Sequence, residues 1–237
     1  MTDQTVPSVG VDRDGGLAVI TIDDGKANAI SFQVEGELDV ALRDAADNGD
    51  AAVLAGRPGR FSAGYDLSEM MAGGSSAIDL MTGGAELLIR LLSHPRPVVA
   101  ACTGHAIAAG AAVLLVCDMR VGLDGPFKIG FNEVGIGLPL PSLVTTLGRE
   151  RLNPRHLIAA TRGASIYGPV DAADVGFLDR VIDSDVVDSA VDEARHLASL
   201  PADAYRLTKE SAQRDLLARL NAAVRLDVEL VASLTGN

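Results

Sequence analysis

The residues best placed to do chemistry are a run of small residues, Ala108-Ala109-Gly110, and a single carboxylate, Glu133. A buried strand is expected over 97–102. It is followed by a turn and then by a helix that begins near the run of small residues. The first turn of a helix leaves backbone N–H groups unpaired and carries a partial positive charge. Small side chains there let a ligand oxygen approach, so the N–H groups can stabilise an oxyanion. Together with a carboxylate that can act as a base, this suggests chemistry on a carbonyl compound.

Periodicity and turn residues predict the elements that position these groups. Strands are predicted over 17–22, 51–54, 97–102, 117–122 and 177–182. Helices are predicted over 31–48, 77–93, from 108–110 onward, 141–147, 154–161, 170–175, 184–200 and 201–233. Ser31 is the expected N-cap of the first helix, with Phe32, Leu38 and Leu42 on its apolar side, and the last helix is expected to break once.

The order of these elements predicts an α/β fold, in which helices cover a parallel or mixed sheet. The change to pure helix after residue 183 divides the chain into a core over 1–183 and a helical region over 184–237. That helical region is expected to pack on its own core or on a neighbouring subunit. The apolar run over 97–116 is interrupted by a turn at Thr103-Gly104, so it predicts strand, turn and helix and no membrane span.

Composition narrows the classes of ligand and compartment. The 237 residues are 48% hydrophobic and carry a formal net charge of −12, which argues against nucleic acid or an anionic membrane as partner. The lysines are only Lys26, Lys128 and Lys209. Cys102 and Cys117 lie in apolar segments and are expected to pack as small hydrophobes in a reducing cytoplasm. Neither a CxxC nor a histidine pair at metal-ligand spacing is present, so no metal site is expected, and the polar N-terminus is unlike a signal peptide.

Four segments occur in an order typical of a known family. They are GKANAIS (25–31), FSAGYDLSEM (61–70), PVVAACTGHAIAAGAAVLLVCD (97–118) and IGFNEVGIGLP (129–139), with a weaker fifth, YGPVDAADVGFLDRVI (167–182). This set resembles the crotonase superfamily, the enoyl-CoA hydratase/isomerase family. The resemblance implies a crotonase-like spiral of ββα units with a helical C-terminal part, assembled as a homotrimer or a dimer of trimers. It also implies an acyl-CoA thioester as substrate, with no further cofactor.

The resemblance also assigns site residues. Two backbone N–H groups would hold the thioester oxygen, those of Tyr65 and Ala109. The family's small triplet is usually rich in glycine, and the two alanines in 108–110 imply a tighter oxyanion hole. The residues that the resemblance places against the substrate or its CoA part are Lys26, Ala27, Asn28, Ala63, Asp66, Leu67, Gly110 and Lys209.

The carboxylates decide which family reaction is expected. Family hydratases use two glutamates, and here the earlier position falls on Ala112 while the later one falls on Glu133. A single glutamate resembles the enoyl-CoA isomerases, which would move the double bond of a 3-enoyl-CoA to the 2-position through an enolate. One carboxylate in an apolar pocket can remove the α proton and return it at the γ carbon.

Other interpretations stay open at this level. The chain could be a hydratase or another crotonase-type enzyme whose missing carboxylate is replaced elsewhere, or a weakly active acyl-CoA-binding protein. Glu133 could be a capping or surface acid, Asp66 could hold its own loop, and Lys209 could be a surface charge. His105 is expected to be a satisfied, partly buried histidine. Ser62 lacks a nearby His–Asp arrangement, so a nucleophilic hydrolase is disfavoured.

Overall fold

The computed structural model describes residues 6–72 and 75–235. The main sheet has six strands in the order β1-β2-β4-β7-β9-β11, and only β1 and β2 pair antiparallel. These strands are β1 (Val9–Asp14), β2 (Leu17–Ile22), β4 (Ala51–Gly56), β7 (Val98–Cys102), β9 (Met119–Leu123) and β11 (Arg180–Ile182). The expected mixed sheet is therefore confirmed.

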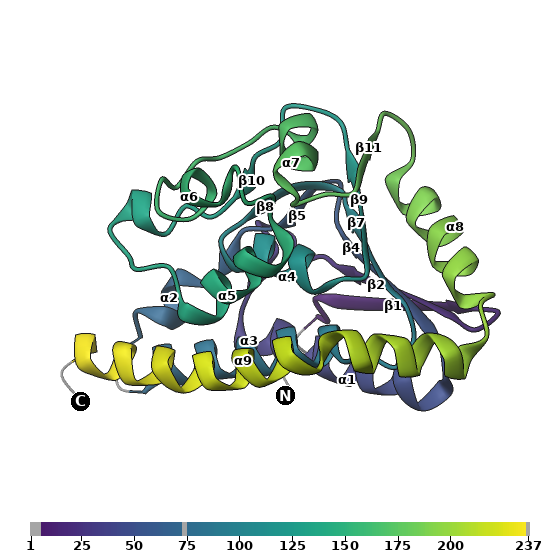
Figure 1. The fold of residues 1–237 in the computed structure, drawn as a ribbon, viewed down its shortest axis with the longest axis horizontal. Helices are drawn as coiled ribbons and strands as arrows, with labels where there is room; N and C mark the ends of the chain where they lie inside the picture. The colour runs from purple at the N-terminus through teal and green to yellow at the C-terminus, as the bar shows by residue number, and fades with distance from the viewer. Residues whose placement is uncertain (1–5, 73–74, 236–237) are drawn as a thin grey trace.

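The central strands of the sheet are continuous apolar runs because both faces of the sheet are covered there. Every residue of β4 and β7 is buried. Alternate residues of β4 enter different cores, since Leu54 packs with the helices on one face and Val53 packs with α8 (Val186–Ala198) on the other. A strand covered on both faces needs apolar side chains at every position. Figure 1 shows α8 on one side of the sheet, with α4 and α5 on the other side.

Two smaller sheets hold the strands closest to the small-residue run. Their members are β3 (Ala29–Ile30), β5 (Gly59–Ser62), β6 (Gly64–Tyr65), β8 (Gly104–Ile107) and β10 (Ile129–Gly130). The chain enters the main sheet, crosses to a small sheet and then forms a helix, as in β7–β8–α4. The expected turn at Thr103-Gly104 is wrong, because Gly104 already belongs to β8. A Cβ at Gly104 would lie 2.0 Å from the Gly59 carbonyl carbon, so only glycine allows this crossing.

The helices mostly follow the expected ranges. Those that the structure describes are α1 (Phe32–Asn48), α2 (Leu67–Met70), α3 (Ser76–Leu92), α4 (Ala109–Val116), α5 (Ser142–Arg151), α6 (Leu157–Ala160), α7 (Pro169–Val175), α8 and α9 (Ala202–Thr235), with a 3-10 turn η1 (Val134–Ile136). Ser31 caps α1 as expected, and its side chain accepts a hydrogen bond from Val34 N at 3.2 Å. Phe32 is 43% exposed, so its expected place on the buried face is wrong, whereas Leu38 and Leu42 are buried.

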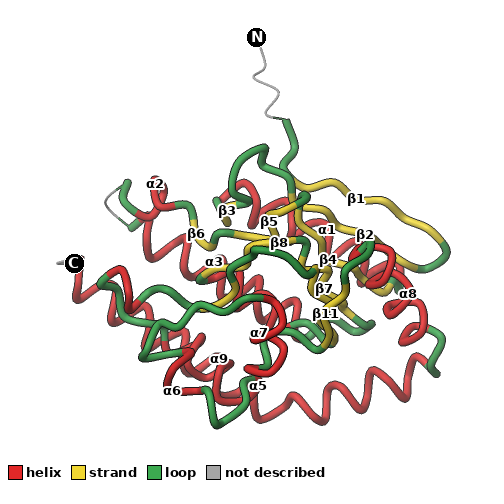
Figure 2. Tube along the Cα trace, turned by 90° about the horizontal axis from the view of Figure 1, so that it is seen from above, coloured by secondary structure: helices red, strands yellow, loops and turns green. Residues whose placement is uncertain are grey.

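The C-terminal helix α9 runs unbroken along one side of the molecule (Figures 1 and 2), so the expected break is wrong. It packs on α3 and α5. Its buried residues Leu216, Leu220 and Ala223 belong to the same core as the strands. Within the described ranges, no helix has a stretch long and apolar enough to cross a membrane. The division at residue 183 and the trimer remain predictions.

Candidate active site

A cavity of about 330 Å³ lies between α4, the loop after β10, α3 and the C-terminal part of α9. Most of its lining is apolar. The polar and small residues that line it include Ala63, Tyr65, Ala108, Ala109, Ala112, Asn132, Glu133 and Asp227. The wall from α3 and α9 is formed by side chains such as Met81, Leu88, Val224 and Val228. The structure thus brings the predicted base and both predicted N–H donors to one cavity.

Ala109 presents its N–H at the start of α4. It is the first residue of that helix, so its N–H has no intrahelical acceptor. The preceding Ala108 has φ +54°, a left-handed conformation that costs energy for a residue with a Cβ. This conformation is held by the hydrogen bond that Ala108 N donates to Gly130 O at 3.0 Å. Strain held in place by the surrounding strands is consistent with a functional turn.

Tyr65 presents its N–H from the edge of β6. Asp66 N donates to Ile30 O at 3.0 Å, and Tyr65 pairs with Ile30 in a parallel ladder. Since hydrogen bonding alternates along such a ladder, the N–H of Tyr65 points away from β3. Gly64, with φ +88°, brings this edge close to α4, and a Cβ on Gly64 would lie 3.2 Å from Ala109 N. The two N–H groups can therefore face one oxygen atom.

Glu133 follows β10 and precedes η1, and its side chain is half-buried in the cavity wall. Its Oε2 is buried and makes no hydrogen bond to the described residues. Burial raises the pKa of this carboxyl, and the backbone N–H groups of Glu133 and Asn132 offset part of that rise. A raised pKa improves a carboxylate as a proton acceptor near neutral pH.

The cavity holds no carboxylate at the earlier family position, since Ala112 is fully buried there and lines the wall. A different acid, Asp227 of α9, lines the cavity and was not expected. Its two oxygens accept from Ser142 N at 2.6 Å and Leu143 N at 2.9 Å, which caps α5. Its sequence signal is a carboxylate spaced with Ala223 on the buried stripe of α9. Asn132, whose Oδ1 is buried without a partner among the described residues, was also missed.

Of the other residues predicted to contact the ligand, some line the cavity and some do not. Ala63 and Leu67 line the cavity. Asp66 caps α2, and its hydrogen bonds with Ser68 are the largest cause of its lowered pKa, which agrees with a loop-holding role. Gly110 does not line the cavity, because it faces Ser62, whose carbonyl oxygen would lie 2.5 Å from an added Cβ.

The loop between β2 and β3 holds three more of the residues predicted to contact the ligand. Lys26 is exposed and Ala27 is half-buried, so both are accessible to a ligand. Asn28 is fully buried, and its Nδ2 donates to Ile22 O at 2.7 Å and Arg60 O at 2.9 Å. Its side chain therefore holds the loop, and the CoA contact stays a prediction.

Lys209 and His105 also have protein partners. Lys209 is buried, and its Nζ lies 2.6 Å from Asp118 Oδ2 in a second cavity, so it is no free surface charge. His105 Nδ1 accepts from Lys128 N at 2.9 Å, as a satisfied histidine does. Lys209 is already neutralised by Asp118, and its contact with CoA remains a prediction.

Comparison with known proteins identifies the family. The model of the enoyl-CoA hydratase/isomerase family matches residues 12–237. The chain belongs to the enoyl-CoA hydratase/isomerase family. A solved family member from Pseudomonas syringae superposes with a TM-score of 0.91 at 37% identity, covering 94% of this chain and 97% of that one. The crotonase fold is thereby confirmed, and the chain is an enzyme of this family.

Curated relatives carry the names of two different reactions. Human mitochondrial enoyl-CoA delta isomerase 1 is 29% identical over 225 residues, covering 92% of this chain and 74% of the relative. A probable enoyl-CoA hydratase of Bacillus subtilis is 30% identical, covering 83% and 74%. The family is therefore established, and the choice between isomerase and hydratase depends on the site itself.

Proposed function

We propose that this enzyme moves the double bond of a 3-enoyl-CoA to the 2-position, with Glu133 as the single acid and base. One observation carries the proposal. Of the two carboxylates that line the cavity, Asp227 is fully engaged by α5, whereas Glu133 has a buried oxygen without a partner among the described residues. Isomerisation needs one such carboxylate, because the proton that leaves one carbon returns at another.

In this mechanism the thioester oxygen accepts hydrogen bonds from the N–H groups of Tyr65 and Ala109. Glu133 removes the proton at the α carbon, and the resulting enolate charge is stabilised by the two N–H donors. The protonated Glu133 then delivers the proton at the γ carbon, which leaves a 2-enoyl thioester. Ala112, at the position of the second family glutamate, cannot hold a water molecule for attack, and Asp227 is engaged by α5.

The CoA part of the substrate is expected to extend from the cavity past Leu67 and Asp66 toward Lys26 and Ala27. Lys26 would supply one of the few cations that an anionic ligand meets on a chain of net charge −12. No further cofactor enters this reaction, because the proton moves within one substrate. We also propose a homotrimer or dimer of trimers in the cytoplasm, as the family resemblance implies.

The test is proton exchange with a 3-enoyl-CoA in deuterated water, combined with product analysis. Wild type should incorporate deuterium and yield the 2-enoyl-CoA. Glu133→Gln should lose at least about a thousandfold in kcat while CoA-ester binding remains, because the variant keeps shape but not basicity. Glu210→Gln, an exposed glutamate of α9, is the matched control. Tight binding by wild type with neither exchange nor product would identify a binding protein and refute the proposal.

A hydratase is the second candidate, and the carboxamide of Asn132 favours it. Its buried Oδ1 has no partner among the described residues and lies in the same cavity as Glu133, where it could hold a water molecule. Addition of water to a 2-enoyl-CoA faster than isomerisation of the 3-enoyl-CoA would establish this alternative. Asn132→Leu should then abolish hydration, whereas it should leave an isomerase active.

A further inference from the structure

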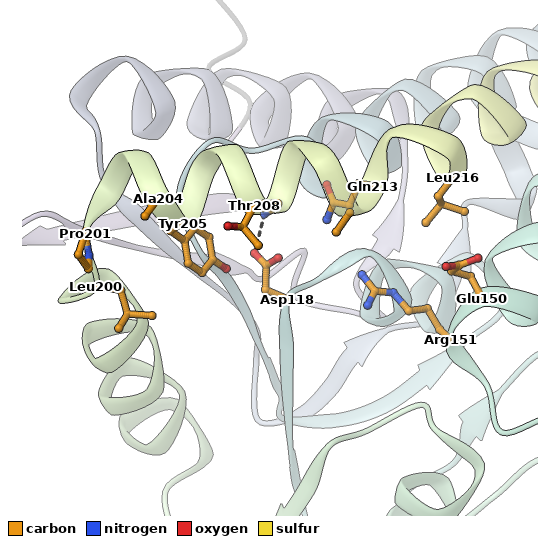
Figure 3. A pocket seen from close by; sticks show the side chains of 12 residues that line it. Asp118, Glu150, Arg151, Leu200, Pro201, Ala204, Tyr205, Thr208, Gln213 and Leu216 are labelled. Atoms are coloured by element: carbon orange, nitrogen blue, oxygen red, sulfur yellow. Dashed lines mark hydrogen bonds and ion pairs between the residues drawn. The ribbon is translucent and has the colours of Figure 1, made fainter.

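A second cavity, of about 630 Å³, lies beside the N-terminal half of α9. Among the described residues it shares no lining side chain with the cavity around Glu133. Its walls come from α9, the end of α5 and the turn at Asp118 (Figure 3). Gln213 in this cavity and Asp227 in the other are about 21 Å apart along the helix axis. The two cavities are therefore separate sites on one helix.

The acids in this second cavity are already paired. Asp118 Oδ2 lies 2.6 Å from Lys209 Nζ and also accepts from Val98 N at 2.8 Å. Glu150 Oε2 lies 2.6 Å from Arg219 Nη2. Each of these carboxylates is therefore already paired with a cation of the chain itself. A further cation that lines the cavity could pair with the anionic group of a ligand.

Arg151 is such a cation. Among the described residues it has no ion-pair partner, and its Nε is buried without a hydrogen bond. Gln213 is 9% exposed, and its carboxamide also lacks a partner within the described chain. Figure 3 shows both side chains pointing into the cavity, one from α5 and one from α9. A guanidinium and a carboxamide that line the same cavity can each donate hydrogen bonds to the oxygens of one carboxylate.

We propose that this cavity binds a small monocarboxylate with a short hydrocarbon body. Its carboxylate would accept hydrogen bonds from Arg151 and Gln213, and its body would pack on Leu200, Pro201 and Leu216. The C-terminal end of α5, where Arg151 stands, carries a partial negative charge. That charge offsets part of the guanidinium's, so a single negative charge is favoured over a phosphate dianion.

Titration of the ¹⁵N-labelled full chain with hexanoate, followed by NMR, tests this site. Saturable shifts are expected at the Gln213 side-chain amide and at backbone amides near Arg151. Arg151→Met keeps the aliphatic length and should weaken binding about ten- to a hundredfold. Arg149→Met removes an exposed charge from the same helix and should change nothing, since Arg149 does not line the cavity. Gln213→Met should weaken binding severalfold and serves if Arg151→Met does not fold.

Four results would overturn the proposal. Shifts confined to Tyr65, Ala109 and Glu133 would place hexanoate in the catalytic cavity. Inorganic phosphate binding as tightly as hexanoate would contradict the monocarboxylate. Equal affinity of the Arg151→Met and Arg149→Met variants would remove the guanidinium from the site. Shifts that follow protein concentration and not hexanoate would assign the cavity to a second copy of the chain. None of these readouts depends on isomerase activity.

Discussion

Replacement of Asp227 by alanine should destabilise the fold, because this residue joins α9 to α5. Asp227 is 6% exposed, and its carboxylate accepts hydrogen bonds from Ser142 N at 2.6 Å and Leu143 N at 2.9 Å. Asp227→Ala removes both acceptors and leaves these two donors at the start of α5 without a protein partner. The same change should loosen the wall that Val224 and Val228 form on the cavity around Glu133.

The magnitude follows from the two hydrogen bonds. Each bond to a charged acceptor contributes about 1.5–3 kcal/mol, and loss of a helix cap costs about 0.5–2 kcal/mol. Removal of the buried charge recovers part of this, so the free energy of unfolding should fall by about 2–4 kcal/mol. For a chain of this size that lowers Tm by roughly 5–15 °C. Asp227→Asn keeps one acceptor oxygen and should cost about half as much.

The assay is unfolding in urea. The m-value should stay unchanged, because an altered m-value would mean that the compactness of the native or the unfolded state had changed. Glu229→Ala, an exposed acid on the same helix, is the control and should lie within about 0.5 kcal/mol of wild type. If Asp227→Ala also stays within that range, the carboxylate does not hold α9 on α5. A loss of stability with an unchanged KM for the CoA ester would show that Asp227 caps α5 without shaping the cavity wall.

Three further predictions concern the oxyanion donors and two buried acids. Gly64→Ala should lower kcat about a hundredfold at little change in KM, since an added Cβ would lie 2.9 Å from Ala108 Cβ and displace the N–H pair; unchanged kcat would refute this. Burial raises the pKa of Glu35 to about 8, so the stability it contributes as a neutral acid is complete below its unfolded pKa and lost as pH rises through about 8. Glu35→Gln should remove that decline with pH in the free energy of unfolding measured in urea. A variant whose stability falls with pH in parallel with wild type would contradict the prediction. Because burial raises the pKa of Glu133, the acidic limb of kcat/KM should lie above the ordinary glutamate value, and a midpoint at or below that value would exclude it as the base.

The sequence predicts most of the long elements for a physical reason, whereas the six-residue strand β1, which is almost wholly exposed, was not predicted. The strands β4 and β7 are buried on both faces, so their apolar runs are continuous, and α1 carries a side-chain cap at Ser31. The short strands β5, β6, β8 and β10 were not predicted. Each has only two to four residues, and their backbones are positioned by close contacts such as that of Gly104 with Gly59. Such contacts come from parts of the chain that are far apart in sequence.

The helix α9 shows an error of another kind. One break is expected in it, yet it continues as a single helix, and Leu216, Leu220 and Ala223 pack in the core formed by the strands. Residues 202–235 hold no glycine or proline, so local propensity also favours an unbroken helix. Glu133, Tyr65 and Ala109, which the family motifs single out, line one cavity, and their catalytic roles stay predictions.

The proposed reaction depends on which carboxylate in the cavity lacks a hydrogen-bond partner, and composition cannot reveal that. Two acids line the wall, so a count would favour a mechanism with two carboxylates. The hydrogen bonds favour one, because α5 holds both oxygens of Asp227 while Oε2 of Glu133 has no partner within the described chain. In the proposed mechanism, the N-terminus of α5 thus both anchors α9 and holds a second acid away from the reacting atoms. A change that freed Asp227 from Ser142 and Leu143 would add a second titrating group to the cavity.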